Sequence, residues 1–249
     1  LADMADRVFP LAAFPDVSEE IQRRLTAQGV ALRLGAAVSG AEETAGGVTI
    51  RFSAGPPVSS DLLVLCVGTR ARTELARAAG LEVGRGIAVN DRMETSCPGI
   101  YAAGDCCEGR NLMTGGRQVI GLWANAAGQG EAAGCSMAGR PTLFSGSIPH
   151  NITHFMGMDF VSFGDVNARG EVRTTGRPSD RRYVRAVVRD GELLCVNMLD
   201  SYEISGVVKH YMLNRFSGNR APLPTALRGL LAREGLSDAF LSLFEGDGH

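Results

Sequence analysis

The sequence lacks the features that would direct a protein to a membrane or to nucleic acid. Its longest uninterrupted apolar run, residues 62–67, is only strand-sized, whereas a membrane helix needs about 20 apolar residues. There is no block of Lys and Arg, and the net charge is -2, which argues against nucleic acid or an anionic membrane as the main partner. The six cysteines include no C-x-x-C. They lie in apolar or Gly/Ala surroundings, as reduced thiols do, so we expect a cytoplasmic location.

Glycine is abundant, and aromatic residues are scarce. The chain has 32 glycines and 6% aromatic residues, a composition that suits an α/β chain with many tight turns between strands and helices. With 249 residues, of which 45% are hydrophobic, it can bury a sizeable core in one or two domains.

Residues 95–105, with the sequence TSCPGIYAAGD, are the most informative stretch. The turn Cys97-Pro98-Gly99 leads into an apolar segment, Ile100 to Ala103, which predicts a short buried strand. Gly104 and Asp105 end this strand where open α/β sheets bind ligands. Gly104 lets a ligand approach the backbone, and Asp105 can accept hydrogen bonds from hydroxyl groups. An aspartate that merely caps the next turn is the structural alternative.

Hydrophobic periodicity predicts the other elements. A helix with Ser18 as its N-cap is expected to present an apolar face and to end at Gln28-Gly29. Further strands are expected at residues 30–34, 48–52, 62–67, 87–89, 152–155, 160–164, 173–175, 181–189 and 192–198. Further helices are expected at residues 73–80, 120–137, 204–216, 225–234 and 237–244. Asp190-Gly191 suits a tight primed turn between the last two strands.

The sequence contains two pairs of residues of types that bind metals or carry redox chemistry. The adjacent Cys106 and Cys107 are expected to be free thiols, because a disulfide between neighbouring residues is strained. His150 and His154 lie four residues apart, but no acid or cysteine beside them completes a ligand set, so we expect no metal site.

Two motifs carry a family resemblance. Residues 95–105 resemble the second flavin-binding motif, T-x-x-P-x-I-[YF]-A-x-G-D, of the pyridine-nucleotide-disulfide oxidoreductase superfamily. Residues 123–130 are similar to the W-x-x-A-x-x-Q-G helix that follows it there. The resemblance implies that Gly104 and Asp105 hold the ribityl chain of FAD. It also places the start of the helix, namely Trp123, Ala124, Asn125 and Ala126, at the isoalloxazine ring.

The physical argument agrees with this placement. Free N–H groups and the positive end of a helix dipole stabilise negative charge on a reduced flavin. The alternative for Trp123 is an ordinary core residue.

Two further segments match the family in part. Residues 1–10 are similar to its L-V-E-x-x-x-R-x-L-P pattern, which places Asp3 at the acid that bonds the adenosine ribose of NAD and favours NADH over NADPH. Residues 66–72 resemble A-x-G-x-x-P-N, with Gly68 matched and Ala71-Arg72 in place of Pro-Asn. A strand-end aspartate and a turn glycine are the structural alternatives for Asp3 and Gly68.

The resemblance implies an α/β fold. The closing parts of two Rossmann-like domains would bind NAD(P) (residues 1–68) and FAD (residues 69–142). A small α+β domain (residues 143–249) would serve dimerisation or close the flavin site from the far side. It implies an FAD-dependent NAD(P)H oxidoreductase that passes hydride from NADH to FAD and electrons on to a redox protein or a small-molecule acceptor. No residue of the chain is nominated as a catalytic acid, base or nucleophile.

Two other functions were considered. Neither G-x-G-x-x-G turn of the family is present, and Leu1 falls inside a predicted strand, so we expect a fragment of a longer protein. The chain could therefore be a non-catalytic subunit or a truncated half that completes a flavin site only with a partner chain. An NADH oxidase or peroxidase is the other alternative, although it would need a lone reactive cysteine that the sequence does not identify.

Overall fold

Contacts between residues divide the chain into two units, each assembled from several segments. The computed structural model describes residues 1–140 and 142–245. Among the described residues, unit 1 comprises residues 1–67, 150–205 and 228–243, and unit 2 comprises residues 68–140, 142–149, 206–227, 244 and 245. The predicted domain boundaries at residues 68 and 142 instead divide the chain into three consecutive segments. These boundaries stay a prediction.

Unit 1 is built on a five-stranded antiparallel sheet with the strand order β7-β8-β11-β10-β9. The strands are β7 (His150–Phe155), β8 (Met158–Gly164), β9 (Glu171–Thr175), β10 (Tyr183–Arg189) and β11 (Glu192–Leu199). All five were predicted, with small differences at their ends. The turn between β10 and β11 has positive φ at both Asp190 (51°) and Gly191 (74°), as a primed hairpin turn requires.

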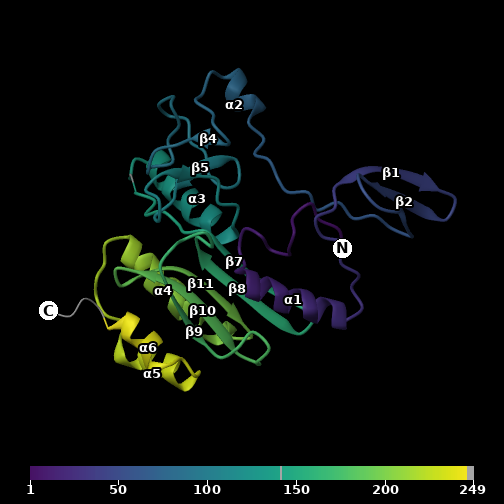
Figure 1. Cartoon of the computed structure of the whole chain (residues 1–249). Coiled ribbons are helices and arrows are strands. Elements are labelled where there is room, and N and C mark those ends of the chain that lie inside the picture. Colours follow the sequence, from purple (N-terminus) through teal and green to yellow (C-terminus); the bar gives the residue numbers. More distant parts are fainter. Residues whose placement is uncertain (141, 246–249) are drawn as a thin grey trace. The chain divides into compact units, whose positions relative to one another are not determined.

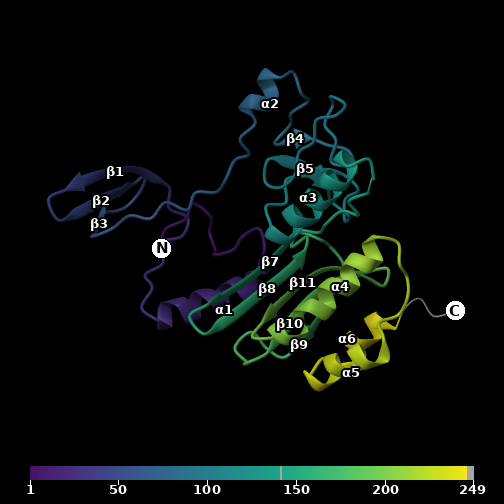
Figure 2. The ribbon, with the colours of Figure 1, turned by 180° about the vertical axis from the view of Figure 1, so that it is seen from behind.

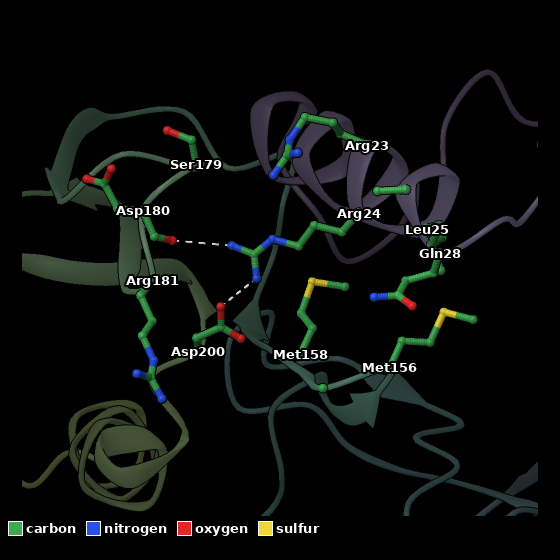
Figure 3. Close-up of a pocket in the computed structure, with 12 residues that line it drawn as sticks. Arg23, Arg24, Leu25, Gln28, Met156, Met158, Ser179, Asp180, Arg181 and Asp200 are labelled. Atoms are coloured by element: carbon green, nitrogen blue, oxygen red, sulfur yellow. Dashed lines mark hydrogen bonds and ion pairs between the residues drawn. The ribbon is translucent and has the colours of Figure 1, made fainter.

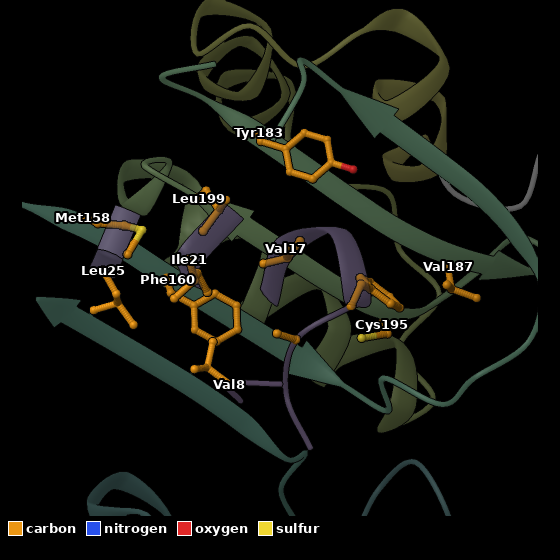
Figure 4. Packing of buried hydrophobic residues seen from close by; sticks show 12 residues of the cluster. Val8, Val17, Ile21, Leu25, Met158, Phe160, Tyr183, Val187, Cys195 and Leu199 are labelled. Carbon is orange, nitrogen blue, oxygen red and sulfur yellow. The ribbon is translucent and has the colours of Figure 1, made fainter. Parts of the chain in front are cut away.

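Helix α1 (Pro15–Ala27) packs on this sheet (Figures 1 and 4). Its buried residues Val17, Ile21 and Leu25 follow the spacing of one helix face. They share a core with sheet residues such as Phe160 and Leu199. The predicted apolar face is therefore confirmed.

The predicted N-cap of α1 is wrong. The N-cap is Phe14, and no side chain caps the helix. Ser18 lies inside the first turns, and its hydroxyl donates to the carbonyl of Val8. The N–H of Phe14 is instead bound by Asn197 of β11, whose Oδ1 accepts it at 2.8 Å. A tertiary contact, which has no local sequence signal, replaces the expected local cap.

A second, three-stranded antiparallel sheet with the order β1-β2-β3 also belongs to unit 1 (Figure 2). Its strands are β1 (Val38–Thr44), β2 (Gly47–Phe52) and β3 (Val58–Ser60). Only β2 was predicted. The other two are short of apolar residues and almost fully exposed, so the sequence carries no burial pattern for them.

Two strands predicted in this part of the chain do not form. Residues 30–34 make only an isolated bridge between Arg33 and Ala2. Residues 62–67 are irregular, and Val67 is 90% exposed. A strand needs a neighbour to pair with its N–H and C=O groups. Within residues 30–34, Arg33 pairs in this way with Leu1 and Asp3, and no backbone group of a described residue pairs with the backbone of residues 62–67.

Unit 2 contains a small sheet with the order β4-β5-β6 and helix α3 (Trp123–Met137). The strands are β4 (Ile87–Ala88), β5 (Cys107–Arg110) and β6 (Arg117–Gln118), and the β4–β5 pair is parallel. Ala132 and Ala133 of α3 pack in a core with Cys107 and Phe144. The predicted helix at residues 73–80 forms as α2 (Glu74–Ala78).

The predicted strand at residues 100–103 does not form either. Tyr101 makes an isolated bridge with Glu94, and the N–H of Ala102 donates to the carbonyl of Met93. Residues 101–103 are half-buried and Ile100 is exposed, and the segment lacks a continuous partner strand among the described residues.

The C-terminal part of the chain is helical, as predicted. Its elements are η1 (Tyr202–Ile204), α4 (Ser205–Phe216), α5 (Thr225–Arg233), α6 (Asp238–Leu241) and η2 (Ser242–Phe244). Within unit 1, α6 contacts β9, and Arg173 of β9 donates to the carbonyl of Ala239 at 2.7 Å. The chain is thus a mixed α/β protein, and its assignment to two Rossmann-like parts plus an α+β domain stays a proposal.

Candidate functional site

The loop at Gly104 and Asp105 is held in a defined conformation. Gly104 has a φ of +83°, a value that side chains other than glycine rarely adopt. Its N–H donates to Oε1 of Gln129, on α3, at 2.7 Å. The backbone is therefore fixed immediately before Asp105.

Asp105 lines a cavity of about 1050 Å³ within unit 2. The other lining residues are 69–73, Arg77, Arg85, Cys106, Gln118, Val119 and Gly121. Asp105 is exposed, and a Cβ placed on Gly121 would lie 3.5 Å from its Oδ2. Its carboxylate therefore stands in the cavity next to the segment that leads into α3, where it can accept hydrogen bonds from hydroxyl groups of a ligand.

Helix α3 begins two residues after Gly121 and has no side-chain cap, its N-cap being Leu122. The first N–H groups of a helix have no partners within the helix, so this end can bind negative charge. Trp123 is 94% exposed, so the alternative of a core tryptophan is wrong.

Asn125, in the first turn of α3, is buried, and its side-chain nitrogen has a hydrogen-bond partner whereas its side-chain oxygen has none. Its Nδ2 donates to the carbonyl of Ile120 at 2.8 Å, while its Oδ1 has no partner. Ala124 is exposed, and Ala126 is half-buried with its Cβ 3.5 Å from the position of a Cβ on Gly104. The structure therefore brings Gly104 and Ala126 together.

Gln129 is a site residue that the sequence argument did not single out. It is fully buried and links α3 to Gly104, and its Nε2 has no partner. The glutamine of the W-x-x-A-x-x-Q-G pattern was a signal that could have identified it. A Cβ on Gly109 would lie 2.2 Å from this Nε2, so Gly109 makes room for the amide.

The two adjacent cysteines have different surroundings, and both are free thiols, as predicted. Cys106 lines the cavity. Cys107 is buried, and burial raises the pKa of its thiol to about 12. A thiol with this pKa is neutral near pH 7 and is a poor nucleophile. Cys107 is thus a packing residue.

Of the predicted cofactor residues, Asp105 is among the lining residues of this cavity, whereas Gly104, Trp123, Ala124, Asn125, Ala126, Gly68 and Asp3 are not. Gly68 has a φ of +92° and is exposed; its neighbour Thr69 lines the cavity, but Gly68 does not. Asp3 belongs to unit 1, and its Oδ1 accepts the N–H of Ala5 at 2.8 Å. The carboxylate of Asp3 is thus engaged in a local turn, and its role toward NAD stays a prediction.

Unit 1 has a cavity of its own, of about 400 Å³, between α1 and the β7–β8 turn (Figure 3). Arg24 forms an ion pair with Asp200 at 2.5 Å and donates to the carbonyl of Asp180 at 3.3 Å (Figure 3). Its guanidinium also pairs with Glu20 at 2.6 Å. These contacts tie α1 to the sheet, so we assign this arginine a structural role.

His154, one of the two histidines considered above, contacts an acid. Its Nδ1 lies 2.5 Å from Oδ1 of Asp159. Within residues 1–140 and 142–245, no group of three or more His, Cys, Asp or Glu side chains is placed to bind a metal ion.

Comparisons with known proteins give the family. The model of the pyridine nucleotide-disulphide oxidoreductase family matches residues 1–130, which is more than half of the 249 residues. The chain belongs to this family. The predicted family resemblance is confirmed.

Individual relatives agree with the family assignment. The chain is 29% identical over 203 residues to the NADH-dependent phenylglyoxylate dehydrogenase subunit epsilon of Aromatoleum evansii, which covers 80% of this chain and 48% of that protein. It is 44% identical over 94 residues to the nitric oxide reductase FlRd-NAD(+) reductase of Klebsiella pneumoniae, covering 38% of this chain and 25% of that protein.

The fold is shared with a solved structure of the same family. An FAD-dependent pyridine nucleotide-disulphide oxidoreductase from Desulfovibrio vulgaris superimposes with a TM-score of 0.76 at 24% identity, covering 86% of this chain and 57% of that one. The chain spans less than half of the length of each of the two curated relatives. No helix within its described residues is long and apolar enough to cross a membrane.

Proposed function

We propose that this chain is part of an FAD-dependent NAD(P)H oxidoreductase and that the cavity of unit 2 holds FAD. The observation that carries the proposal is the cavity of about 1050 Å³ into which Asp105 projects. The family assignment supplies the class of cofactor, and the cavity supplies polar groups of the right chemistry.

The residues present fit a flavin dinucleotide. The carboxylate of Asp105 accepts hydrogen bonds from the hydroxyl groups of a ribityl chain. The positive φ of Gly104 and the contact with Gln129 hold the carboxylate in place. The uncapped start of α3, from Trp123 to Ala126, offers free N–H groups to the electron-rich edge of a flavin ring.

FAD, when bound, supplies the redox chemistry: it accepts a hydride from NADH, which leaves as NAD⁺, and passes the electrons on to an acceptor. The chain itself contributes binding, orientation and electrostatics. Asp105 fixes the position of the bound cofactor, and the dipole of α3 stabilises the negative charge that reduction brings. No side chain of this segment is assigned as a proton donor or acceptor.

NADH is proposed as the electron donor. Asp3 is proposed to bind the ribose of NADH, and Gly68 is proposed as a further cofactor-binding residue. An acid at the position of Asp3 would bond a ribose hydroxyl and repel a 2′-phosphate. The electron acceptor is proposed to be a redox protein or a small molecule. We also propose that the protein is a homodimer and that it is cytoplasmic. The two Rossmann-like parts and the α+β domain belong to the same proposal.

A second candidate function is an NADH-oxidising subunit of a larger enzyme. The match that extends over 80% of the chain is to a protein named as a subunit, epsilon, of an NADH-dependent dehydrogenase. Copurification of the complete gene product with other chains would favour this form, whereas activity of the isolated product with NADH and a soluble acceptor would favour a free-standing reductase.

The decisive experiment replaces Asp105 in the complete product of the gene. Asp105→Ala removes a charged hydrogen-bond acceptor, and such bonds contribute about 1.5–3 kcal/mol, so we expect affinity for FAD to fall about 10- to 100-fold. The matched control is Glu131→Ala, which removes an exposed acid of α3 outside the cavity. Equal FAD affinity of Asp105→Ala and the control, measured by flavin fluorescence, would remove Asp105 from the site.

A further inference from the structure

The five-stranded sheet of unit 1 has two edges that differ in how they are protected. The strand order β7-β8-β11-β10-β9 makes β7 and β9 its outer strands (Figure 1). The outer side of an edge strand presents N–H and C=O groups that can pair with another strand. Proteins therefore protect such edges with charged side chains, bulges or a covering segment.

The edge at β9 has two of these protections. Arg173 in this strand forms an ion pair with Glu171 at 2.8 Å, and it donates to the carbonyl of Ala239, in α6, at 2.7 Å. The N–H of Ser237, just before α6, donates to Oγ1 of Thr175 at 3.3 Å. Charged side chains and a segment bound to the strand thus protect this edge.

The edge at β7 has none of these protections within the described part of the chain. Residues 150–155 contain no Lys, Arg, Asp, Glu or Pro, and they pair with β8 residue for residue, without a bulge. Ile152, in the middle of the strand, is 40% exposed. A regular edge strand with an exposed apolar side chain is typical of a strand that pairs with another chain.

The hairpin determines which backbone groups of β7 face outward. Its turn, Met156-Gly157, has positive φ at both residues, 50° and 69°, and such a two-residue turn is closed by hydrogen bonds between the flanking residues. In an antiparallel pair, residues that exchange hydrogen bonds alternate with residues that do not. Counted from the turn, Ile152 and His154 do not bond to β8. Their N–H and C=O groups face outward, where no described residue binds them.

We propose that β7 pairs with β7 of a second copy of this chain, so that the two sheets join into a single sheet. This inference rests on the homodimer in the proposed function, whose contact surface it names, and it does not depend on the flavin site. A two-fold axis brings identical surfaces together, and two copies of one strand that meet across such an axis are antiparallel. With Ile152 on the axis, its two copies exchange both of their outward N–H···O=C bonds.

The side chains of β7 suit a partner with the same sequence. In this register Ile152 faces its own copy, so an exposed apolar side chain is buried against another. Asn151 lies opposite residue 153 of the second copy, which is a threonine, so two uncharged polar side chains meet. Tyr202 is 46% exposed, and its ring packs edge-on against His154 with the ring centroids 4.6 Å apart. It extends the apolar surface on the same face of the strand as Ile152.

The first test changes the charge of the edge in the complete gene product. Ile152→Lys places two ammonium groups opposite each other across the axis and leaves the bonds between β7 and β8 in place. We expect the dissociation constant of the dimer, measured by sedimentation equilibrium, to rise at least tenfold. Val172→Lys is the matched control, because Val172 is an apolar residue, 50% exposed, on the protected strand β9. This control should dimerise like the wild type.

The second test examines the register by cross-linking, in a background where the exposed Cys66 and Cys97 are changed to Ser. Ile152→Cys places two thiols opposite each other, with Cα atoms about 5.5 Å apart, a separation that a disulfide spans. His154→Cys is the control, because its two copies lie four residues out of register, roughly 13 Å apart. Oxidation with diamide should convert the first variant to a covalent dimer and leave the second as a monomer on a non-reducing gel.

The outcomes separate this inference from the proposed function. Equal dissociation constants for Ile152→Lys and the wild type, or equal weakening by Val172→Lys, would overturn pairing through β7 and leave the homodimer standing. Absence of a cross-link in Ile152→Cys would also overturn it. A wild type that is monomeric at roughly 100 μM would defeat both the inference and the homodimer, whereas the oxidoreductase proposal would stand if that protein still binds FAD. A dimer that cross-links through Ile152→Cys but binds no FAD would support the inference and defeat the proposed cofactor.

Discussion

Replacement of Gln129 by methionine tests whether a buried amide positions the loop at Asp105. Methionine has a similar volume, and volume-conserving core exchanges cost little. It has no acceptor for the N–H of Gly104, which Gln129 Oε1 binds at 2.7 Å. The exchange thus removes this hydrogen bond, together with the weaker one that the Cys107 thiol donates to the same oxygen at 3.5 Å. It leaves the packing of α3 largely intact.

The expected change in stability has two contributions, one from the oxygen Oε1 of the Gln129 amide and one from its nitrogen Nε2. Leaving the half-buried N–H of Gly104 without a partner costs about 1–3 kcal/mol. The Nε2 of Gln129 is already unpaired, so its removal recovers part of that cost, roughly 1 kcal/mol. We therefore expect unit 2 to lose up to about 2 kcal/mol of stability. If this loss destabilises the loop conformation that places Asp105 in the cavity, FAD affinity decreases by up to about 30-fold.

Three measurements check this expectation in the complete gene product. Urea unfolding gives the change in the free energy of unfolding. Amide hydrogen exchange reports whether Gly104 loses protection, and flavin titration gives the change in affinity. The matched control is Gln129→Glu at about pH 6, where burial keeps the new carboxyl group protonated. This variant retains an acceptor oxygen and should resemble the wild type.

The outcome that would refute the reasoning is specific. If Gln129→Met keeps the exchange protection of the Gly104 N–H and binds FAD like the wild type, the amide does not position the loop. If Gln129→Glu and Gln129→Met lose flavin to the same extent, packing of the side chain matters and its acceptor oxygen does not.

Two further predictions concern titratable groups. Burial, and after it the hydrogen bond to the Asp16 carboxylate, raises the pKa of Tyr183 above its usual value of 10.0. As the pH rises, this tyrosine therefore ionises in the unfolded chain before it ionises in the folded one. The free energy of unfolding should thus fall above pH 10 by up to about 1.4 kcal/mol per pH unit. Tyr183→Phe should lose this slope in pH-dependent unfolding, and an unchanged slope would show that Tyr183 does not cause it. Iodoacetamide at pH 8 should label the exposed Cys66 and Cys97 in the folded protein and leave Cys107 unlabelled, because burial keeps its thiol neutral; labelling of Cys107 at the rate of the exposed pair, read by mass spectrometry, would contradict this.

Local sequence chemistry predicted much of the secondary structure. The Asp190-Gly191 turn and the apolar residues of β10 and β11 identify a hairpin without any tertiary information, because turn geometry depends on φ values that few residues adopt. The apolar spacing of α1 likewise gave its buried face. The TSCPGIYAAGD motif identified the family, which the comparisons confirm.

Other features depended on contacts between distant residues. Residues 62–67 have the composition of a buried strand but form none, since strand formation requires a partner that composition does not specify. Ser18 looked like a helix cap, yet Asn197, far along the chain, binds the N–H of Phe14. The cavity residues come from separate segments around positions 70, 85, 105 and 120. Sequence patterns describe neighbours along a chain, whereas a binding site consists of neighbours in space, so only the tertiary structure could show that these segments line one cavity with Asp105.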